Sequence, residues 1–448
     1  MASPFESNKI SAPSLSQASL VKMISDTFAN LTDKRKGKNT RYELSDAALS
    51  AFAVFFMQNS SFLAQQINLQ KSKGKNNLQS LFGAYSNPCD NQIRSLLDGV
   101  SAEELYPIFN SIFKELDAIG YFKSWKVLND SLLIAIDGTE YFSSEKISCE
   151  CCSTQKLVNG KTRYSHKAVT PVVVSAKEHQ VIALPPEFIT PQDGHAKQDC
   201  ELAAATRWLL REEQGLAAHN VTILGDDLFS HQPFCELVIK QNKHFIFVCK
   251  PDSHSTLYEW LADFEREGKV SSMTISHWDG KQKIIDHYRW INGVPLRNSD
   301  DAMFVNFCEM RRVNQDGKQL YFNTFVTDHF ISGSNVIEII IAGRSRWKIE
   351  NENNNTLKTK GYHFEHNFGH GKKNLSAVLA TLILLAFLFH TILEYFDQCY
   401  RLLRDTLSTR KTFFDDIRAL TRYICFDNWR QMLEFMLKGL EIPIPEAV

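Results

Sequence analysis

The stretch Leu132-Leu-Ile-Ala-Ile-Asp-Gly-Thr139 decides the fold class of this 448-residue chain. Its apolar residues predict a buried strand that ends at Asp137. A second stretch, Val221-Thr-Ile-Leu-Gly-Asp-Asp227, has the same pattern and predicts a strand that ends at Asp226. A helical pattern from about Gln198 to Glu213 separates the two. We therefore expect an α/β sheet in which the two strands run side by side and both carboxylates lie at adjacent carboxyl ends.

A third carboxylate, Glu350, lies in the segment Gly343-Arg-Ser-Arg-Trp-Lys-Ile-Glu-Asn-Glu352, which has helical spacing. We expect Asn335 to cap a helix that runs from about Val336 to Leu357 and carries Glu350. A helix face beside the two strand ends would gather all three carboxylates at one place.

Three carboxylates gathered in this way are suited to hold Mg²⁺, or Mn²⁺ in its place, because hard divalent cations are bound by few carboxylates together with phosphate oxygens and waters. Two metals about 4 Å apart supply what phosphoryl transfer needs. Asp137 is expected to bridge both ions, and Asp226 and Glu350 each to complete one. Asp227 lies one residue past the strand end and Glu352 points away around the helix, so the first member of each pair is preferred.

The third segment carries a family resemblance. Arg346 and Glu350 keep an Arg-x3-Glu spacing, with Trp347 and Ile349 between them. This motif resembles the catalytic core of bacterial insertion-sequence transposases of the DDE class, and the resemblance extends over roughly 130 to 390.

Two positions depart from the family's Tyr, Arg, Glu, Lys signature. Gly343 stands where the family has Tyr, and Leu357 stands where it has Lys, with Lys358 one residue later. The roles of that Tyr and Lys on the DNA are therefore not carried over, and the excision route, with or without a hairpin, stays open.

The resemblance implies an α/β ribonuclease-H-like core with an all-β insertion subdomain and a helical N-terminal domain. It implies an enzyme that binds the terminal inverted repeats of an insertion element as double-stranded DNA, cleaves at its ends and joins them to target DNA. A homodimer on DNA is expected by the same resemblance. The alternatives are a catalytically inert DNA-binding protein derived from a transposase and a stand-alone metal-dependent nuclease.

Residues expected to contact DNA share a positive charge and lie in two regions. Near the third carboxylate they are Arg344, Arg346, Lys348 and Lys358. In a basic patch over 33–41 they are Lys34, Arg35 and Lys36. A second basic patch spans 71–75. For Arg346 the alternative is an ion pair with Glu350, and for each patch it is a solvated loop. The net charge of −1 shows no global basic field.

The domain organisation follows the patterns along the chain. We expect a helical DNA-binding domain over 1–120, the catalytic core over 121–250 and 331–400, a β-rich insertion over 251–330, and a helical C-terminal region over 401–448. Further strands are expected over 168–175, 180–184, 244–249, 284–290, 303–312 and 321–326. Turns are expected at Asp279-Gly280, Asn292-Gly293 and Asp316-Gly317.

The segment Leu375 to Leu393 is almost wholly apolar and approaches the length of a membrane span. A buried helix packed across the sheet explains it as well, and we expect no membrane partner. The N-terminus shows no secretory signal, and ten irregularly spaced cysteines do not predict a disulfide framework. A cytoplasmic, nucleoid-associated location is therefore expected.

Cys149, Cys152 and His166 form a CxxC followed by a histidine, which is half of a zinc motif. Candidates for a fourth ligand are Cys151, His179, His195 and Cys200, and the alternative is reduced structural thiols. A separate histidine group, formed by His363, His366 and His370, lies in a glycine-rich segment. For that group, phosphate contacts or capping are favoured over a bound metal.

Overall fold

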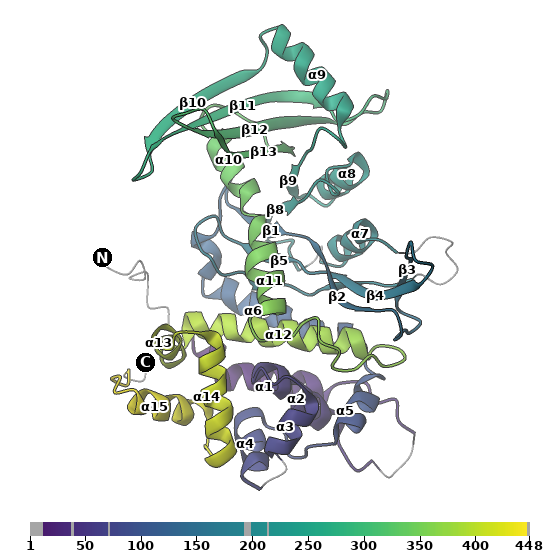
Figure 1. The fold of residues 1–448 in the computed structure, drawn as a ribbon, viewed down its shortest axis with the longest axis vertical. Coiled ribbons are helices and arrows are strands. Elements are labelled where there is room, and N and C mark those ends of the chain that lie inside the picture. Colours follow the sequence, from purple (N-terminus) through teal and green to yellow (C-terminus); the bar gives the residue numbers. More distant parts are fainter. Residues whose placement is uncertain (1–11, 37–39, 70–71, 192–198, 213–214, 446–448) are drawn as a thin grey trace.

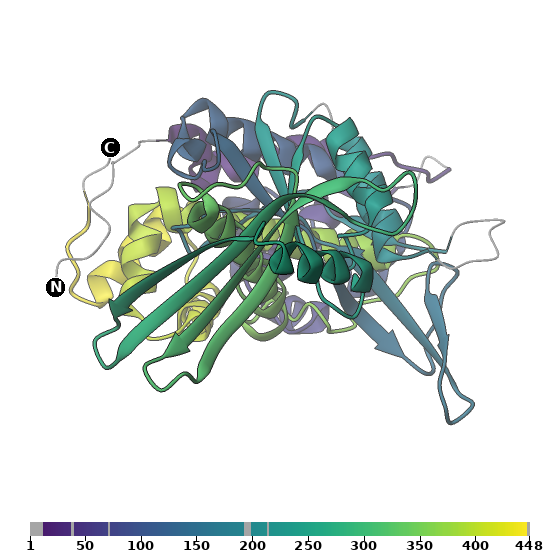
Figure 2. The same cartoon turned by 90° about the horizontal axis from the view of Figure 1, so that it is seen from above.

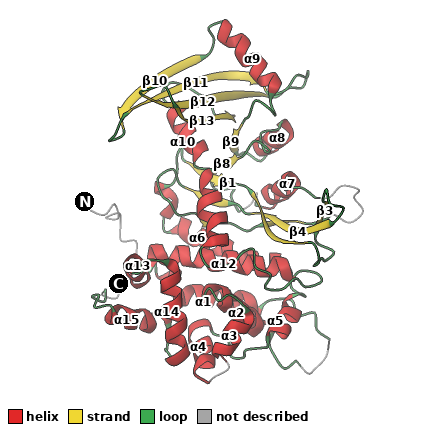
Figure 3. Ribbon diagram, viewed as in Figure 1, coloured by secondary structure: helices red, strands yellow, loops and turns green. Residues whose placement is uncertain are grey.

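The computed structural model describes residues 12–36, 40–69, 72–191, 199–212 and 215–445. Their centre is a nine-stranded sheet with the order β10-β11-β12-β13-β9-β8-β1-β5-β6 (Figures 1 and 3). The strands are β1 (Ser131–Ala135), β5 (Val172–Val174), β6 (Ile182–Ala183), β8 (Asn220–Gly225), β9 (His244–Val248), β10 (Ser271–Trp278), β11 (Lys283–Pro295), β12 (Phe304–Asn314) and β13 (Gln319–Thr327). The protein is thus a mixed α/β structure with one large sheet.

Strand directions place the two aspartates together. β1 and β8 are parallel, with Leu132 opposite Val221, and β5 is antiparallel to β1. All five residues of β1 are buried, as expected for a strand covered on both faces. Because β1 and β8 run in the same direction, Asp137 and Asp226 leave the sheet at the same edge. This confirms the expected strand–helix–strand arrangement, in which α7 (Glu201–Arg211) precedes β8.

A second, four-stranded sheet begins immediately after Asp137. It contains β2 (Gly138–Ser144), β3 (Ser153–Lys156) and β4 (Thr162–Val169) in the order β2-β4-β3, and β7 (Glu187–Ile189) pairs with β4. The single strand expected over 168–175 is divided between β4 and β5, which lie in different sheets. The division falls at Thr170-Pro171, where proline has no N–H to continue a ladder.

The inserted region is not all-β as expected, because α9 (Ser255–Arg266) lies within it and packs on β11. Leu257, Tyr258, Leu261 and Phe264 give α9 a helical period that the sequence interpretation missed. The strands β10–β13 continue the central sheet, because β13 pairs with β9 (Figures 1 and 2). Two expected turns separate strands, but Asn292-Gly293 lies inside β11 at a β-bulge, where Gly293 has a φ of 76°.

The apolar segment forms α12 (Leu375–Phe396), and 89% of its most apolar window is buried inside the protein. It is the one helix in the described residues long and apolar enough to cross a membrane. α2 (Leu44–Phe56) packs along it, with the rings of Phe52 and Phe389 5.1 Å apart.

The helices at the two ends of the chain form one layer beyond α12 (Figure 1). Asn77 donates to the carbonyls of Thr421 and Ile424, and the Trp429 indole donates to Leu81. These helices are α1 (Gln17–Ala29), α3 (Phe62–Leu69), α4 (Ser72–Phe82), α5 (Asp90–Leu97), α13 (Gln398–Thr406), α14 (Arg410–Tyr423) and α15 (Trp429–Gly439). The remaining helices are η1 (Pro13–Leu15), η2 (Ala102–Leu105), α6 (Tyr106–Ala118), η3 (Tyr121–Ser124), α8 (Gln232–Lys240), α10 (Val336–Arg344), η4 (Ile349–Asn354) and α11 (Asn355–Thr359).

Candidate active site

Asp137 is held from two sides. Its carbonyl accepts the N–H of Thr170 at 3.0 Å, and its Oδ2 accepts a hydrogen bond from Asn354 Nδ2 at 3.2 Å. Asn354 in turn accepts hydrogen bonds from the Thr170 hydroxyl at 2.9 Å and from Asn353 at 3.0 Å. The carboxylate is therefore fixed in place by the segment that follows Glu350.

The electrostatics of Asp137 report its surroundings. Burial raises the pKa of Asp137 to about 7, and the charge of Glu201 adds to the rise. Arg346 lowers this pKa, while Glu350 and Asp226 raise it further. The structure thus brings Asp226 and Glu350 each close enough for its charge to act on Asp137, although the three residues come from three distant segments.

Asp226 and its neighbour Asp227 have different hydrogen-bond partners. Asp227 accepts the Lys250 N–H on Oδ1 and the Ser253 hydroxyl on Oδ2, so both of its oxygens bind the loop after β9. Asp226 accepts the Leu228 N–H through Oδ1 at 2.9 Å.

The helix expected from Val336 to Leu357 is broken. α10 ends at Arg344, and η4 is a π-helix over Ile349–Asn354 that continues into α11. The π-helix widens the turn after Glu350 and puts the side chains of Asn353 and Asn354 into the interior, where 0% and 8% of them are exposed. It is this irregularity that lets Asn354 reach Asp137.

Glu350 is half-exposed and is bound by Arg346, whose Nη1 lies 2.6 Å from Glu350 Oε1. The ion pair that was the alternative role for Arg346 is thus present. In the described part of the chain, the groups whose metal-ligating atoms all lie within 4.8 Å of one another do not include Asp137, Asp226 and Glu350. The three carboxylates therefore do not close around a single point in the metal-free protein.

Glu201 is a fourth carboxylate at this place, and the sequence interpretation missed it. The Gly138 N–H donates to Glu201 Oε1 at 2.6 Å. A Cβ at Gly138 would lie 2.3 Å from the Glu201 carboxyl carbon, so only glycine allows this approach. Burial raises the pKa of Glu201, the Gly138 hydrogen bond lowers it, and Asp226 raises it. The available signal was a carboxylate in the first turn of the helix that precedes β8.

One predicted DNA contact is wrong. Lys348 is 4% exposed, and its ammonium donates to the backbone carbonyls of Ser175 and Glu178. Burial lowers its pKa. The break after α10 turns Lys348 toward β5 and away from solvent, so its role is structural.

The other cations near Glu350 occupy two places. Arg344 lies over the ring of Tyr321 at 4.3 Å, and it lines a groove with Tyr321, Asn323, Gly343, Arg346 and Trp347. Lys358 forms an ion pair with Glu365 at 2.9 Å. Arg344 and Arg346 are therefore the cations that share one surface beside the carboxylates.

Packing explains the residues at the two positions where this chain differs from the signature that it resembles. A Cβ at Gly343 would lie 2.8 Å from Phe325 and 2.9 Å from Ile246, because α10 presses on β13 and β9 there. A tyrosine therefore has no room at this position. Leu357 is fully buried in the core, where a lysine would lose its hydration.

Of the basic patch over 33–41, Lys34 and Lys36 are exposed, and Arg35 pairs with Asp33 and donates to the Tyr42 carbonyl. Residues 37–39 lie outside the described residues. In the second patch, residue 71 is also outside them, and the rest of the patch is described by its backbone alone, within α4.

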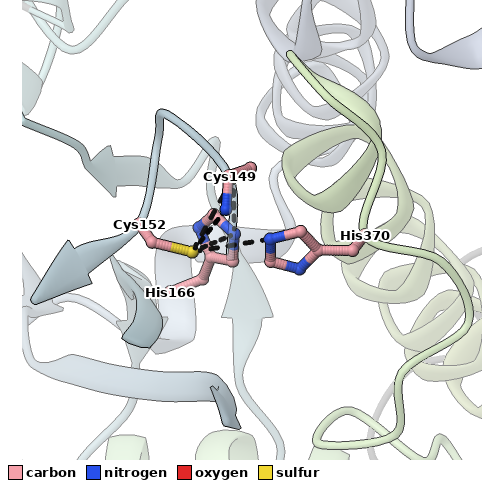
Figure 4. Close-up of side chains that lie close together, drawn as sticks. All are labelled: Cys149, Cys152, His166 and His370. Carbon is pink, nitrogen blue, oxygen red and sulfur yellow. Dashed lines mark hydrogen bonds between the residues drawn. The ribbon is translucent and has the colours of Figure 1, made fainter. Parts of the chain in front are cut away.

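A thiol–imidazole cluster lies beside the second sheet (Figure 4). Cys149 and Cys152 come from the loop between β2 and β3, His166 comes from β4, and His370 comes from the loop between α11 and α12. The ligand atoms of all four lie within 4.8 Å of one another. Burial raises the pKa of Cys149 to about 11 and lowers the pKa of His166 to about 4. The fourth member is thus His370, and not one of the residues expected from the sequence. Of those, Cys151 bonds the Lys373 carbonyl, His179 and Cys200 are exposed, and His195 lies outside the described residues.

No protein-family model matches the chain, and no curated protein matches it. Among solved structures, the chain is similar to one described as a cryo-EM structure of a piggyBac transposase synaptic complex with hairpin DNA. The TM-score is 0.41 and the sequence identity is 10%, over 98% of this chain and 84% of that chain. The function has to be inferred from the residues of the site.

Proposed function

We propose that this protein is a DNA transposase of the DDE class, encoded by an insertion element, that cuts and joins DNA with Asp137, Asp226 and Glu350. The observation that carries the proposal is the setting of the buried Asp137 carboxyl at the end of β1, where the charges of Glu201, Glu350 and Asp226 all act on it. Burial and these neighbours hold the pKa of Asp137 near 7. Several negative charges in a partly buried place raise one another's pKa and cost free energy, and groups with such shifted pKa values are found preferentially at functional sites.

The fold is consistent with the core that the sequence resemblance implies. Antiparallel strands β1, β5 and β6 are followed by α7 and by β8, which runs beside β1. This arrangement is the one expected of a ribonuclease-H-like core, and it puts the first two carboxylates at neighbouring strand ends. The inserted strands β10–β13 lie between Asp226 and Glu350 along the chain, as they do in the family.

The donor set fits Mg²⁺ because every candidate ligand is a carboxylate oxygen. Asp137, Asp226 and Glu350 would hold the ions, and Mn²⁺ would substitute. When bound, the metal would neutralise the phosphate charge and activate the attacking oxygen. Asp137 must give up a proton whose pKa lies near 7 to become a ligand, and the Asn354 hydrogen bond keeps its oxygen aimed at the site as it does so.

The surface beside the carboxylates suits a DNA backbone. Arg346 pairs with Glu350, and Arg344 lies in the same groove. A guanidinium can bind a phosphate oxygen through its planar fork. On engagement of a phosphate, Arg346 would exchange Glu350 for that phosphate and free the carboxylate for a metal. Double-stranded DNA is thus the proposed partner, and a homodimer on paired DNA ends is the proposed assembly.

The test is a cleavage assay on DNA that carries the inverted repeats flanking the reading frame, with Mg²⁺ or Mn²⁺. Asp137→Asn and Glu350→Gln should abolish nicking and leave DNA binding intact. Glu352→Gln is the matched control, two residues along the same helix, and should nick like wild type.

Binding of the end DNA with no nicking by wild type would overturn the catalytic proposal in favour of an inert DNA-binding protein. Nicking with no strand joining would favour a stand-alone nuclease. Equal loss of nicking in Glu350→Gln and Glu352→Gln would remove the specific role of Glu350.

A further inference from the structure

We propose that Cys149, Cys152, His166 and His370 bind one zinc ion that fastens the segment after Glu350 to the sheet after Asp137. The zinc site stands on its own geometry, while its effect on catalysis rests on the proposed function.

The first argument is the spacing of the four ligand atoms. Tetrahedral zinc, with Zn–S about 2.3 Å and Zn–N about 2.0 Å, requires sulfurs about 3.8 Å apart and sulfur–nitrogen pairs about 3.5 Å apart. The two sulfurs lie 3.8 Å apart. His166 Nε2 lies 3.4 Å from Cys149 Sγ and 3.5 Å from Cys152 Sγ, and His370 Nε2 lies 3.5 Å from Cys152 Sγ. Four of the six edges thus have the lengths of a zinc tetrahedron, and the other two, from His370 to Cys149 and to His166, are no longer than 4.8 Å.

Neither a disulfide nor a hard cation fits the cluster as well as zinc does. A disulfide requires sulfurs about 2.05 Å apart, which excludes one here. Thiolate and imidazole ligands in a tetrahedron favour zinc over hard cations such as Mg²⁺. The other compact group in the described residues, His244, Asp328 and His329, has its atoms engaged already. His244 Nδ1 bonds Asp328 at 2.6 Å, and His329 Nε2 bonds Thr222 at 3.0 Å.

The cluster is built by its surroundings. The Cys152 N–H donates to the Cys149 carbonyl at 3.2 Å, and the Cys149 N–H points at Cys152 Sγ at 3.4 Å, so the CxxC loop is folded around its own thiols. Tyr141 stacks on His166 with ring centroids 5.7 Å apart, and Phe142 packs on His370 at 4.6 Å. Aromatic side chains thus shield both imidazoles and fix their orientation.

The loop that carries His370 is also anchored independently of the cluster. The Asp98 carboxylate accepts the N–H groups of Lys372, Lys373, Asn374 and Leu375, at the start of α12. A Cβ at Gly371 would lie 2.4 Å from Asp98 Oδ1, so glycine is required beside the ligand. These bonds hold His370 near the thiols before any metal binds, which lowers the entropy cost of forming the site.

The position of the site gives it a consequence. Cys152 and His370 are 218 positions apart, so one ion would cross-link the β2–β4 sheet, which begins at Gly138, to the loop after α11. The first segment follows Asp137 and the second follows Glu350 and Asn354. The zinc ion would therefore limit how far these acidic residues separate. On binding, each thiol releases one proton to solvent and the two thiolates become ligands.

The test is the zinc content of the purified full-length protein by mass spectrometry, with Co²⁺ replacement as the spectroscopic probe. We expect one zinc per chain, and after exchange the visible bands of tetrahedral cobalt with sulfur-to-metal charge transfer. Cys152→Ser and His370→Ala should lose at least tenfold in metal affinity. Cys151→Ser, an adjacent thiol outside the tetrahedron, is the matched control and should keep its zinc.

Three results would overturn the site. The wild-type protein could contain no zinc and give no cobalt spectrum. Cys151→Ser could lose zinc as Cys152→Ser does, or His370→Ala could fold and bind zinc with wild-type affinity. If a variant does not fold, the X-ray absorption spectrum of the wild-type zinc decides, because it must show two sulfur and two nitrogen neighbours. Asp137→Asn should lose nicking and keep zinc, which separates a failure of the zinc site from a failure of the catalytic proposal.

Discussion

Replacing Asp137 by asparagine should stabilise the metal-free protein, and should do so more strongly as the pH rises. The folded protein holds the pKa of Asp137 at about 7, against an ordinary 3.8. Between these pH values the unfolded chain has lost a proton that the folded chain keeps, so the free energy of unfolding falls with rising pH and levels off above 7. Asparagine has no charge to bury and still offers Oδ1 to the Asn354 amide.

The magnitude follows from the raised pKa. Each unit of pKa difference corresponds to about 1.4 kcal/mol. The free-energy cost of ionising Asp137 in the folded protein grows from pH 5 up to its pKa of about 7 and then stays constant. These two pH units correspond to about 3 kcal/mol. The stability advantage of Asp137→Asn should widen by that amount over the same interval.

Urea unfolding in EDTA, measured for both proteins at pH 5, 6, 7 and 8, provides the assay. Added Mg²⁺ should then raise the stability of wild type at pH 8 much more than that of Asp137→Asn, since the variant lacks one of the three carboxylate ligands. Parallel pH dependences for the two proteins would refute a raised pKa at Asp137. An equal effect of Mg²⁺ on the stability of both proteins would refute a site that depends on this carboxylate.

Three further outcomes are expected. Asn354→Ala removes the hydrogen bond that Asp137 accepts, so its pKa should rise and the pH profile of nicking should shift to higher pH; Asn351→Ala, exposed on the same π-helix, should leave the profile unchanged. Gly343→Ala places a methyl group against two buried side chains and should lower the unfolding free energy by about 1–3 kcal/mol, measured by denaturation, whereas an unchanged stability would show that α10 can move. Lys348→Met should change stability and leave DNA affinity unaltered at constant salt in a filter-binding assay; a weaker salt dependence of binding would show a phosphate contact after all.

The strands β1 and β8 were predictable because their signals are local, whereas β2, β3, β7 and β10 were not predicted. An apolar run that ends at a carboxylate marks both β1 and β8, and the intervening helical pattern sets their relative direction. The same local signals failed where tertiary contacts decide. Asn292-Gly293 has the composition of a hairpin turn, but the pairing of β11 with β12 continues past it as a bulge.

The helix after Asn335 shows a second limit. Its period predicts one uninterrupted element, and the π-helix was not predictable because it depends on buried partners. Asn354 bonds both Asp137 and Thr170, and these bonds compensate the irregular backbone. Lys348 was misassigned for the same reason: charge alone suggests a phosphate contact, and only the broken helix directs the side chain into the interior.

The fourth member of the thiol–imidazole cluster illustrates a different obstacle. Cys149, Cys152 and His166 are close in sequence and suggest a metal site by their spacing. His370 belongs to another motif, and no regular spacing relates it to the CxxC. The fold brings His370 to the CxxC, because β2 starts immediately after Asp137 and α12 starts just beyond the segment that carries Glu350.

That topology also connects the two metal centres proposed for this chain. Two segments leave the candidate active site, one after Asp137 and the other after Asn354. They meet again at the thiol–imidazole cluster. Because Asn354 bonds Asp137 directly, the two segments are joined at both places, by a hydrogen bond at one and by four metal ligands at the other. A closed loop of contacts resists separation more than either contact alone, since opening one leaves the other in place. Loss of zinc should therefore weaken nicking through the position of Glu350, with the carboxylates themselves unchanged.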